Sequence, residues 1–130
     1  VLMMRLETDL LEVIECVIEN RLNNLKISWT DKTCITIVLC AKGYPSKYIK
    51  NSEIKNLSNI SSDKNNQIFH AGTYEKNSKI FSNGGRVLSV TSAAENLIQA
   101  RNKSLINLDK IKWIDGFFRK DIGWRAIKDK

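Results

Sequence analysis

The sequence lacks the long apolar runs of a membrane protein and the cysteine patterns of a disulfide-rich or zinc-binding domain. Its 130 residues are 42% hydrophobic, but no stretch approaches the roughly 20 consecutive apolar residues that a membrane-spanning helix needs. Arg5 and Glu7 interrupt the early apolar run, which argues against a secretory signal. Because Cys16, Cys34 and Cys40 form no Cys-x-x-Cys spacing, we expect reduced thiols that fill the core.

Other absences narrow the chemistry that the chain can perform. The single histidine cannot form a metal cluster alone, and there is no Gly-x-x-x-x-Gly-Lys-Ser/Thr loop or acidic cluster suited to Mg²⁺. Twenty-one basic and 14 acidic residues give a net charge of +7, which favours anionic partners in general. The lysines are scattered, however, and no aromatic residues interleave with them as in a single-strand nucleic-acid platform. We therefore expect neither a membrane nor a nucleic acid as a partner.

What the sequence does contain is enough helix and strand signals for one ordinary domain. Apolar residues at three- and four-residue steps predict an amphipathic helix over about 4–22. Residues 33–41 give the strongest strand signal, and their nearly unbroken apolar character predicts a central strand buried on both faces. Further strands are predicted over 67–73, 79–82 and 86–92, and their short connections favour antiparallel pairing.

The last third of the chain predicts a helix and an aromatic tail. Ser92 and Glu95 have the spacing of a capping box, so we expect a helix over about 93–109. Aromatic side chains recur through residues 112–127 and need burial, so this tail should fold back on the sheet. The predicted fold class is α+β: an antiparallel sheet of about four strands, flanked by an N-terminal and a C-terminal helix.

A glycine turn followed by an arginine precedes the last predicted strand. Gly84 and Gly85 can take backbone angles closed to other residues, and Arg86 follows with a permanent charge and a planar fork of donors. A flexible turn that ends in an arginine on a rigid strand is one way to hold an anion. The local sequence favours a plain hairpin turn with a solvated arginine, because Gly-Gly is a common hairpin signal. Residues alone leave both interpretations open.

Four short signatures stand in order along the chain: Lys-Gly-Tyr-Pro at 42–45, Phe-His-Ala-Gly-Thr at 69–73, Gly-Gly-Arg-Val-Leu at 84–88 and Arg-Lys-Asp-Ile-Gly-Trp-Arg-Ala at 119–126. With these and the segment 6–12, nearly the whole chain resembles the C-terminal domain of the glycinamide ribonucleotide synthetase family. The resemblance implies a cytoplasmic ATP-grasp ligase of purine biosynthesis. Such an enzyme activates glycine with ATP, and the amine of 5-phosphoribosylamine then attacks the acyl phosphate.

The same resemblance implies that ATP and the metal ion are bound by a part of the enzyme that is not in this sequence. The family's metal-binding motif, Asn-x-Arg-x-Gly-Asp-Pro-Glu, is absent here, as are its glycine-rich ATP lid and its nucleotide-clamping lysine. ATP and Mg²⁺ or Mn²⁺ are implied as cofactors of the complete enzyme, and we expect this chain alone to bind neither and to be inactive. Residues 1–25 are expected to belong to the end of the ATP-grasp core, and 26–130 to form the C-terminal domain.

The resemblance also implies where the substrate would bind. In related enzymes this domain closes over the nucleotide substrate and helps to bind its phosphate. Arg86, at the glycine turn, is expected to donate charge-assisted hydrogen bonds to the 5′-phosphate of phosphoribosylamine. Lys42, Lys79 and His70 are further candidates for the same substrate site.

Three alternatives remain beside this interpretation: a purely structural domain, an inactive gene remnant and a basic module that binds anions or nucleic acid. In the tail, Asp121 and Arg125 lie among aromatic residues. We expect these two residues to pair with each other and hold the tail in place.

Overall fold

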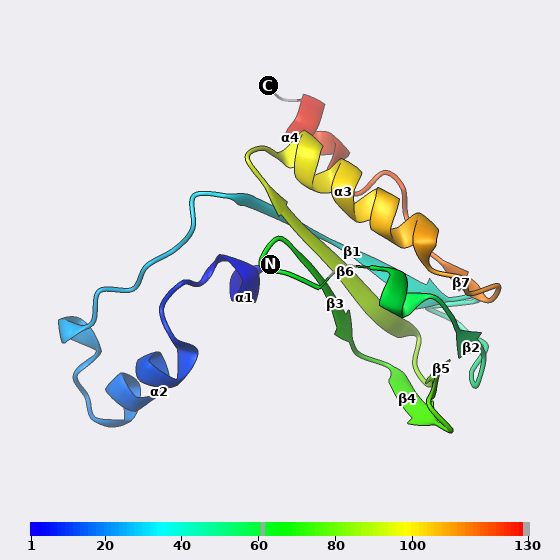
Figure 1. Ribbon diagram of the computed structural model, residues 1–130, viewed down its shortest axis with the longest axis horizontal. Coiled ribbons are helices and arrows are strands. Elements are labelled where there is room, and N and C mark those ends of the chain that lie inside the picture. The colour runs from blue at the N-terminus through cyan, green and yellow to red at the C-terminus, as the bar shows by residue number, and fades with distance from the viewer. Residues whose placement is uncertain (61, 129–130) are drawn as a thin grey trace.

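The computed structural model describes residues 1–60 and 62–128. They form a main sheet covered by a helix, a smaller second sheet, and an N-terminal arm that consists of residues 1–30 (Figure 1). In chain order the elements are α1 (Leu2–Arg5), α2 (Leu10–Ile18), η1 (Leu22–Asn24), β1 (Thr33–Ala41), β2 (Glu53–Ile54), η2 (Leu57–Asn59), β3 (Asn66–His70), β4 (Thr73–Lys76), β5 (Lys79–Ser82), β6 (Arg86–Ala94), α3 (Leu97–Lys110), β7 (Gly116–Phe117) and α4 (Trp124–Lys128). The predicted α+β class is confirmed. In the described ranges no helix is long and apolar enough to cross a membrane.

The main sheet is antiparallel, with the strand order β3-β6-β1-β7. Alternate β1 side chains, Ile35, Ile37 and Leu39, are buried, and Ile37 and Leu39 pack with Leu108 of α3 in the larger core cluster. The predicted central position of β1 is confirmed. The predicted burial on both faces is wrong, because α3 covers one face and the alternating side chains of the other are only half-buried (Figure 1).

A second sheet, which the sequence did not predict, has the order β2-β5-β4. The β4–β5 hairpin turns at Asn77 and Ser78, both with positive φ. The strand predicted over 67–73 is split, because the chain leaves the main sheet after His70 and enters the second sheet at Thr73. The hairpin turn that the local sequence favours at Gly84–Gly85 does not form, since β5 pairs with β2 and β4 whereas β6 pairs with β3 and β1.

Two glycines allow the two connections between the sheets to touch. A Cβ built on Gly72 would lie 2.7 Å from the Gly84 Cα and 2.8 Å from the Arg86 carbonyl oxygen. These neighbours are backbone atoms, which cannot rotate away. The expectation that Gly84 and Gly85 supply unusual backbone angles is wrong: among the described glycines, positive φ occurs at Gly43 and Gly123.

The N-terminal arm contains two short helices where one helix over 4–22 was predicted. The chain between α1 and α2 is extended, and the Glu7 and Thr8 amides both donate to the Ser28 carbonyl, at 3.0 and 3.4 Å. Asp9 then begins α2, its carboxylate accepting a hydrogen bond from the Leu11 amide at 2.8 Å. An Asp side chain in this position competes with a continuous helix, because it satisfies a first-turn amide.

The arm leaves many of its apolar side chains in solvent. Leu11 is 62% exposed, Val17 54% and Ile18 74%, whereas Cys16 is buried. In Figure 1 α2 lies away from both sheets. An apolar patch of this kind promotes association when nothing covers it.

The helix α3 begins later than predicted. Its N-cap is Asn96, whose Oδ1 accepts a hydrogen bond from the Gln99 amide at 3.0 Å. Ser92 is fully buried within β6, so the predicted capping box with Glu95 is wrong. β6 pairs with β1 as far as Ala94, so the first residues of the predicted helix belong to this strand instead.

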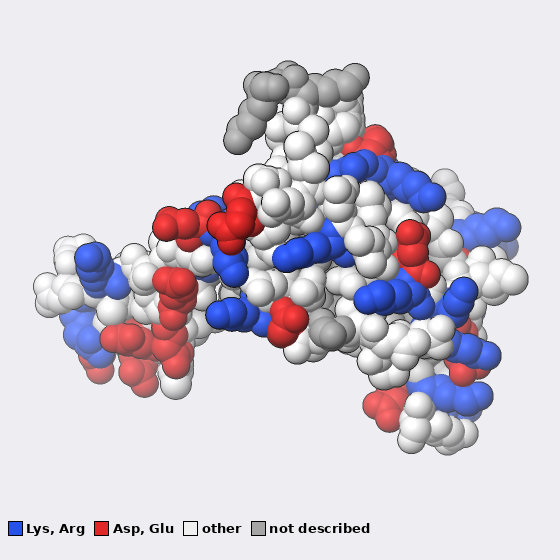
Figure 2. Space-filling view, turned by 45° about the horizontal axis from the view of Figure 1, so that its top comes forward, with Lys and Arg blue, Asp and Glu red and all other residues white. Residues whose placement is uncertain are grey.

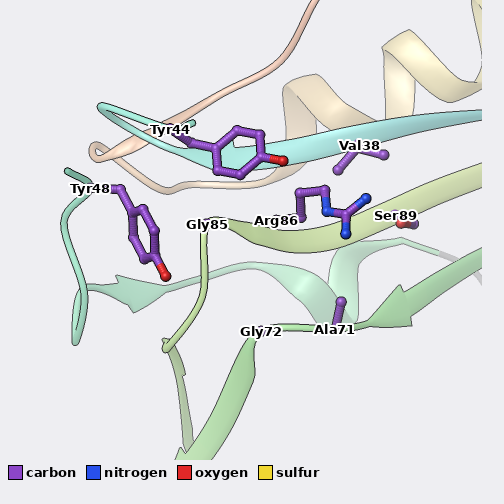
Figure 3. Close-up of a pocket in the computed structure, with 8 residues that line it drawn as sticks. All are labelled: Val38, Tyr44, Tyr48, Ala71, Gly72, Gly85, Arg86 and Ser89. Atoms are coloured by element: carbon purple, nitrogen blue, oxygen red, sulfur yellow. The ribbon is translucent and has the colours of Figure 1, made fainter. Parts of the chain in front are cut away.

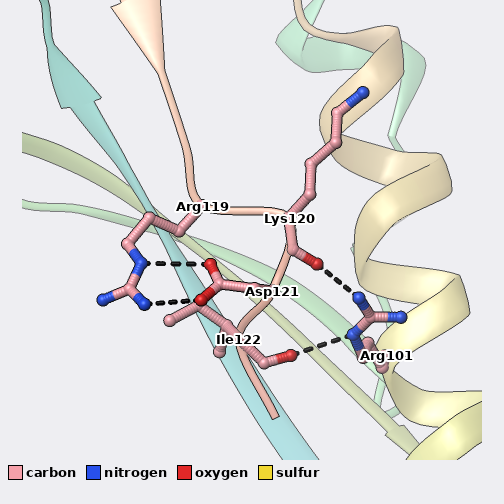
Figure 4. A network of polar contacts seen from close by, with 5 residues as sticks. All are labelled: Arg101, Arg119, Lys120, Asp121 and Ile122. Atoms are coloured by element: carbon pink, nitrogen blue, oxygen red, sulfur yellow. Dashed lines mark hydrogen bonds and ion pairs between the residues drawn. The ribbon is translucent and has the colours of Figure 1, made fainter. Parts of the chain in front are cut away.

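The aromatic tail folds back on the sheet, as predicted. Phe117 in β7 pairs with β1, and Arg101 of α3 donates hydrogen bonds to the carbonyl oxygens of Lys120 and Ile122 (Figure 4). The predicted pair of Asp121 and Arg125 does not form.

Asp121 and Arg125 each interact with another residue of the tail instead. Asp121 accepts two hydrogen bonds from Arg119, two residues away, at 3.1 and 2.5 Å. Arg125 instead lies over the Trp124 ring, with its guanidinium carbon 5.4 Å from the ring centroid. The short sequence separation makes the Arg119 pair the easier one to form.

Replacing Gly72 by alanine should destabilise the fold. The added Cβ would overlap backbone atoms of Gly84 and Arg86, and relieving that overlap should lower the free energy of unfolding by about 1–3 kcal/mol. Urea unfolding of Gly72→Ala measures the loss, with Asn83→Ala, an exposed neighbour, as the control. Equal stability of the two variants would contradict the close glycine contact.

Replacing Val17 and Ile18 together by glutamate should reduce self-association of the chain. Both side chains are largely exposed, so charges there cost little folding free energy but interrupt the apolar patch. Sedimentation velocity over a concentration series compares this variant with the original chain. If both sediment identically as monomers at every concentration, the arm does not drive association.

Candidate functional site

An open cavity of about 600 Å³ lies where β1 and β6 meet the loop that follows β1. Figure 3 shows the residues around it: Val38, Tyr44, Tyr48, Ala71, Gly72, Gly85, Arg86 and Ser89. Val38 and Ser89 are opposite one another in the β1–β6 ladder. Their neighbours Ile37 and Leu88 belong to the core cluster that contains α3 residues. The cavity therefore lies on the sheet face away from α3.

A β-bulge directs Arg86 toward this cavity. Leu39 pairs with Leu88, but the next residue, Cys40, pairs with Arg86, so Val87 is an extra residue in β6. A regular strand would place residues 86 and 89 on opposite faces, because side chains alternate. The bulge changes that phase. Arg86 consequently shares the open face with Ser89, while Val87 and Leu88 are both buried in the core.

Gly85 makes room for the aromatic wall of the cavity. A Cβ on Gly85 would lie 2.3 Å from Cδ2 of Tyr44 and 3.2 Å from Cε1 of Tyr48. The two tyrosine rings are tilted by 58° to each other, with centroids 6.4 Å apart. Their loop is fixed at its base by the Lys42 amide, which donates to the Asp115 carbonyl at 2.7 Å.

The electrostatics of the cavity suit an anion. Arg86 is exposed, and in the described part of the chain no carboxylate lines the cavity. Burial raises the pKa of the nearby Cys40 thiol, and the Arg86 guanidinium lowers it in part. The thiol is therefore neutral near pH 7 and does not cancel the arginine charge.

A smaller, mainly apolar cavity of about 290 Å³ adjoins the first on the same face. Val38 and Tyr44 line both cavities. The other lining residues of the smaller cavity are Thr36, Cys40, Pro45, Phe117, Phe118, Arg119 and Ile122. The two cavities therefore adjoin at Val38 and Tyr44 on the open face of β1, and together they are called the trough.

The structure brings only part of the predicted site together. Arg86 and Gly85 line the larger cavity, whereas Gly84 lies behind it against Gly72. Lys79 is in the second sheet, where its Nζ lies 3.4 Å from a Glu53 carboxylate oxygen. The other two candidates, Lys42 and His70, do not line the cavity either.

Each of those two candidates has another role. Lys42 belongs to the base of the tyrosine loop, and its carbonyl accepts from the Ile49 amide at 3.2 Å. His70 is exposed at the end of β3, with Nδ1 3.0 Å from the Thr73 hydroxyl.

Sequence reasoning missed Tyr44, Tyr48 and Ser89. Tyr44 belongs to the Lys-Gly-Tyr-Pro signature, which could have identified it. Ser89 could not be placed beside Arg86, because strand alternation argues against it.

Within residues 1–60 and 62–128 no group of three His, Cys, Asp or Glu side chains is arranged to hold a metal ion. Neither cavity of the trough is lined by a carboxylate from those ranges. The donor set therefore does not fit Mg²⁺, which prefers carboxylate and phosphate oxygens. No chemical step through a metal is assigned to this chain.

Replacing Arg86 by methionine should raise the pKa of Cys40 further, because a nearby positive charge is lost. Alkylation of Cys40 at a fixed mildly alkaline pH should slow, and its pH–rate midpoint should move upward. Peptide mass mapping after timed iodoacetamide labelling measures this, with Cys34, at the far end of β1, as the internal control. An unchanged Cys40 midpoint would contradict the placement of Arg86 by the bulge.

Comparison with known proteins identifies the family. The model of the family "Phosphoribosylglycinamide synthetase, C domain" matches residues 34–125. A phosphoribosylamine–glycine ligase of Brucella melitensis is 41% identical over 128 residues, which cover 98% of this chain and 30% of the relative. A chloroplastic phosphoribosylamine–glycine ligase of Arabidopsis thaliana is 39% identical over 132 residues, covering all of this chain and 25% of that protein.

A solved structure agrees with these relatives. The crystal structure of phosphoribosylamine–glycine ligase from Thermotoga maritima has a TM-score of 0.59 and 33% identity, and the match covers 68% of this chain and 21% of that one. This chain thus spans about a quarter to a third of the length of the curated relatives described above. It belongs to the phosphoribosylglycinamide synthetase C-domain family.

Proposed function

We propose that this chain acts as the C domain of a phosphoribosylamine–glycine ligase and binds the 5′-phosphate of phosphoribosylamine through Arg86. The complete enzyme would join glycine to 5-phosphoribosylamine with ATP, giving glycinamide ribonucleotide, ADP and phosphate. The relatives that carry this name support the reaction. The observation that carries the site is the bulge at Val87, which places Arg86 in an open cavity lined by no carboxylate of the described ranges.

Arg86 suits a phosphate monoester on physical grounds. A guanidinium offers parallel donors that match phosphate oxygens, and its charge is independent of pH in the physiological range. The Ser89 hydroxyl on the same face can donate a further hydrogen bond. Lys42 can approach if its loop moves, whereas Lys79 and His70 would need the second sheet or the end of β3 to shift.

The chemistry that consumes ATP is assigned to the rest of the enzyme. ATP and Mg²⁺ or Mn²⁺ would be held by an ATP-grasp core, and this chain alone would be inactive. Its part is positioning: a substrate held by its phosphate presents its amine in a fixed direction, which lowers the entropic part of the barrier. We place the enzyme in the cytoplasm, although the Arabidopsis relative is named as chloroplastic.

The ATP-grasp core is also the proposed partner of the N-terminal arm. Leu11, Val17 and Ile18 expose an apolar surface that a neighbouring domain would bury. The arm is held together as far as Thr30, whose amide donates to the Arg5 carbonyl at 2.9 Å. The proposed domain limit at residue 25 therefore falls within a paired segment, and the arm would dock as a unit.

Replacing Arg86 by alanine in the complete enzyme should weaken the use of phosphoribosylamine. A lost charge-assisted hydrogen bond should raise the barrier for kcat/KM by about 1.5–3 kcal/mol. The KM for ATP should change little, because ATP does not contact this domain in the proposal. Steady-state kinetics with each substrate varied in turn measures both quantities.

The control for this experiment is Lys103→Ala, which removes an exposed cation from α3, on the other face of the sheet. If Arg86→Ala behaves like the control, the domain is a scaffold and Arg86 is not in the site. An equal effect on ATP and phosphoribosylamine would indicate a general loss of domain closure.

A further inference from the structure

The apolar part of the trough has no role in binding a substrate that ends at a ribose. The cavity at Arg86 is large enough, at about 600 Å³, for a sugar phosphate, and a second cavity of about 290 Å³ adjoins it at Val38 and Tyr44. Val38 and Tyr44 form the junction of the two. A ligand anchored by phosphate at Arg86 can therefore extend over Val38 into an apolar space.

The lining of the second cavity indicates what such an extension should be. Phe117, Phe118 and Tyr44 provide aromatic surfaces, and Phe117 is 40% exposed. Arg119 stands at the rim and offers a planar guanidinium. Aromatic rings and arginine planes are the groups on which nucleobases stack, largely without sequence preference.

The rim arginine is held in place by contacts from both sides of the tail. Asp121 accepts two hydrogen bonds from Arg119, and Arg101 of α3 fixes the carbonyl oxygens of Lys120 and Ile122 (Figure 4). These hydrogen bonds attach the tail segment around Arg119 to α3. A cation fixed in this way can stack on a flat ligand at a smaller entropic cost than a free side chain.

We propose that the trough binds a nucleoside 5′-monophosphate, with the phosphate at Arg86, the ribose over Val38 and the base in the cavity formed by Phe117, Phe118 and Arg119. The proposal rests on the proposed function, because it uses Arg86 as the anchor of the ribose 5-phosphate. A nucleotide bound in this way occupies the place of phosphoribosylamine. It is therefore a competitive inhibitor of the complete enzyme.

Charge supports the orientation. In the described ranges no carboxylate lines either cavity, and the only charged groups lining them are Arg86 and Arg119. The Asp121 carboxylate near the rim is already paired with Arg119. The phosphate belongs at Arg86 rather than at Arg119, because Arg119 is neutralised by this pair and lies beside apolar walls.

The test compares three ligands on the 130-residue chain: inorganic phosphate, ribose 5-phosphate and adenosine 5′-monophosphate. Chemical-shift titrations of the ¹⁵N-labelled protein give the three dissociation constants. A stacked base should make the nucleotide bind about tenfold tighter than ribose 5-phosphate. Equal affinities would overturn the proposal without touching the proposed function.

Variants locate the base. Phe117→Ala and Arg119→Ala should bring the nucleotide's affinity down to that of ribose 5-phosphate, whereas Ile114→Ala, which replaces an exposed apolar residue of the same tail (92% exposed), should keep the difference. Arg86→Met should weaken both ligands together. A nucleotide advantage that survives the Phe117 and Arg119 variants would overturn the base position.

The same titrations separate the two proposals. Ribose 5-phosphate binding that is indifferent to Arg86→Met would remove the proposed function's phosphate site. Nucleotide shifts confined to residues outside the trough would remove the further inference alone.

Discussion

The pairing of β1 with β6, and the single extra residue that it accommodates, is the constraint on which the site depends. From Thr33 to Leu39 the ladder is regular, and it fixes Ile35, Ile37 and Leu39 beneath α3. The bulge at Val87 then changes the phase of β6. Without it, Arg86 would pair with Ala41, which is fully buried, and an unpaired guanidinium would face the core. The cost of burying such a charge is large. The bulge thus keeps the Arg86 charge out of the core and places it in the cavity.

The second determinant is close contact between backbone segments. Gly72 and Gly84 touch where the chain passes between the two sheets, and Gly85 admits the rings of Tyr44 and Tyr48. The glycines are needed for space and not for unusual torsion angles. As a result the cavity is bounded on one side by backbone and on the other by aromatic rings, and its shape is set by contacts that leave little freedom.

Much of the fold could be predicted from the sequence, and the parts that could not have identifiable causes. The apolar run at 33–41, the strand at 79–82 and the aromatic tail were correct, because hydrophobic pattern alone decides them. The broken first helix depends on backbone pairing with Ser28, twenty residues away. Gly84–Gly85 looks like a hairpin turn locally, and only the register of four other strands shows that it joins two sheets.

In the candidate site, too, some residues could be predicted from the sequence and others could not. Arg86 was selected through the family resemblance of the Gly-Gly-Arg-Val-Leu signature, because the local sequence alone favoured a solvated arginine. Ser89 could not be selected, since a bulge has no sequence signature of its own here. Lys79 was a candidate because it was expected on the same hairpin as Arg86, and His70 because it was expected to face the same site. In the structure neither lines the cavity: Lys79 lies near Glu53 and His70 contacts Thr73.

One face of the main sheet packs in the core beneath α3, and the other lines the candidate site. Val87 is fully buried and its neighbour Arg86 is exposed. Folding therefore constrains Val87, whereas the charge of the cavity depends on Arg86. Mutations that erase the cavity's charge need not lower the abundance of the protein, and mutations that unfold it need not touch the cavity. A variant that lacks the cavity's charge would therefore remain a well-folded domain, and its abundance alone would not reveal the loss.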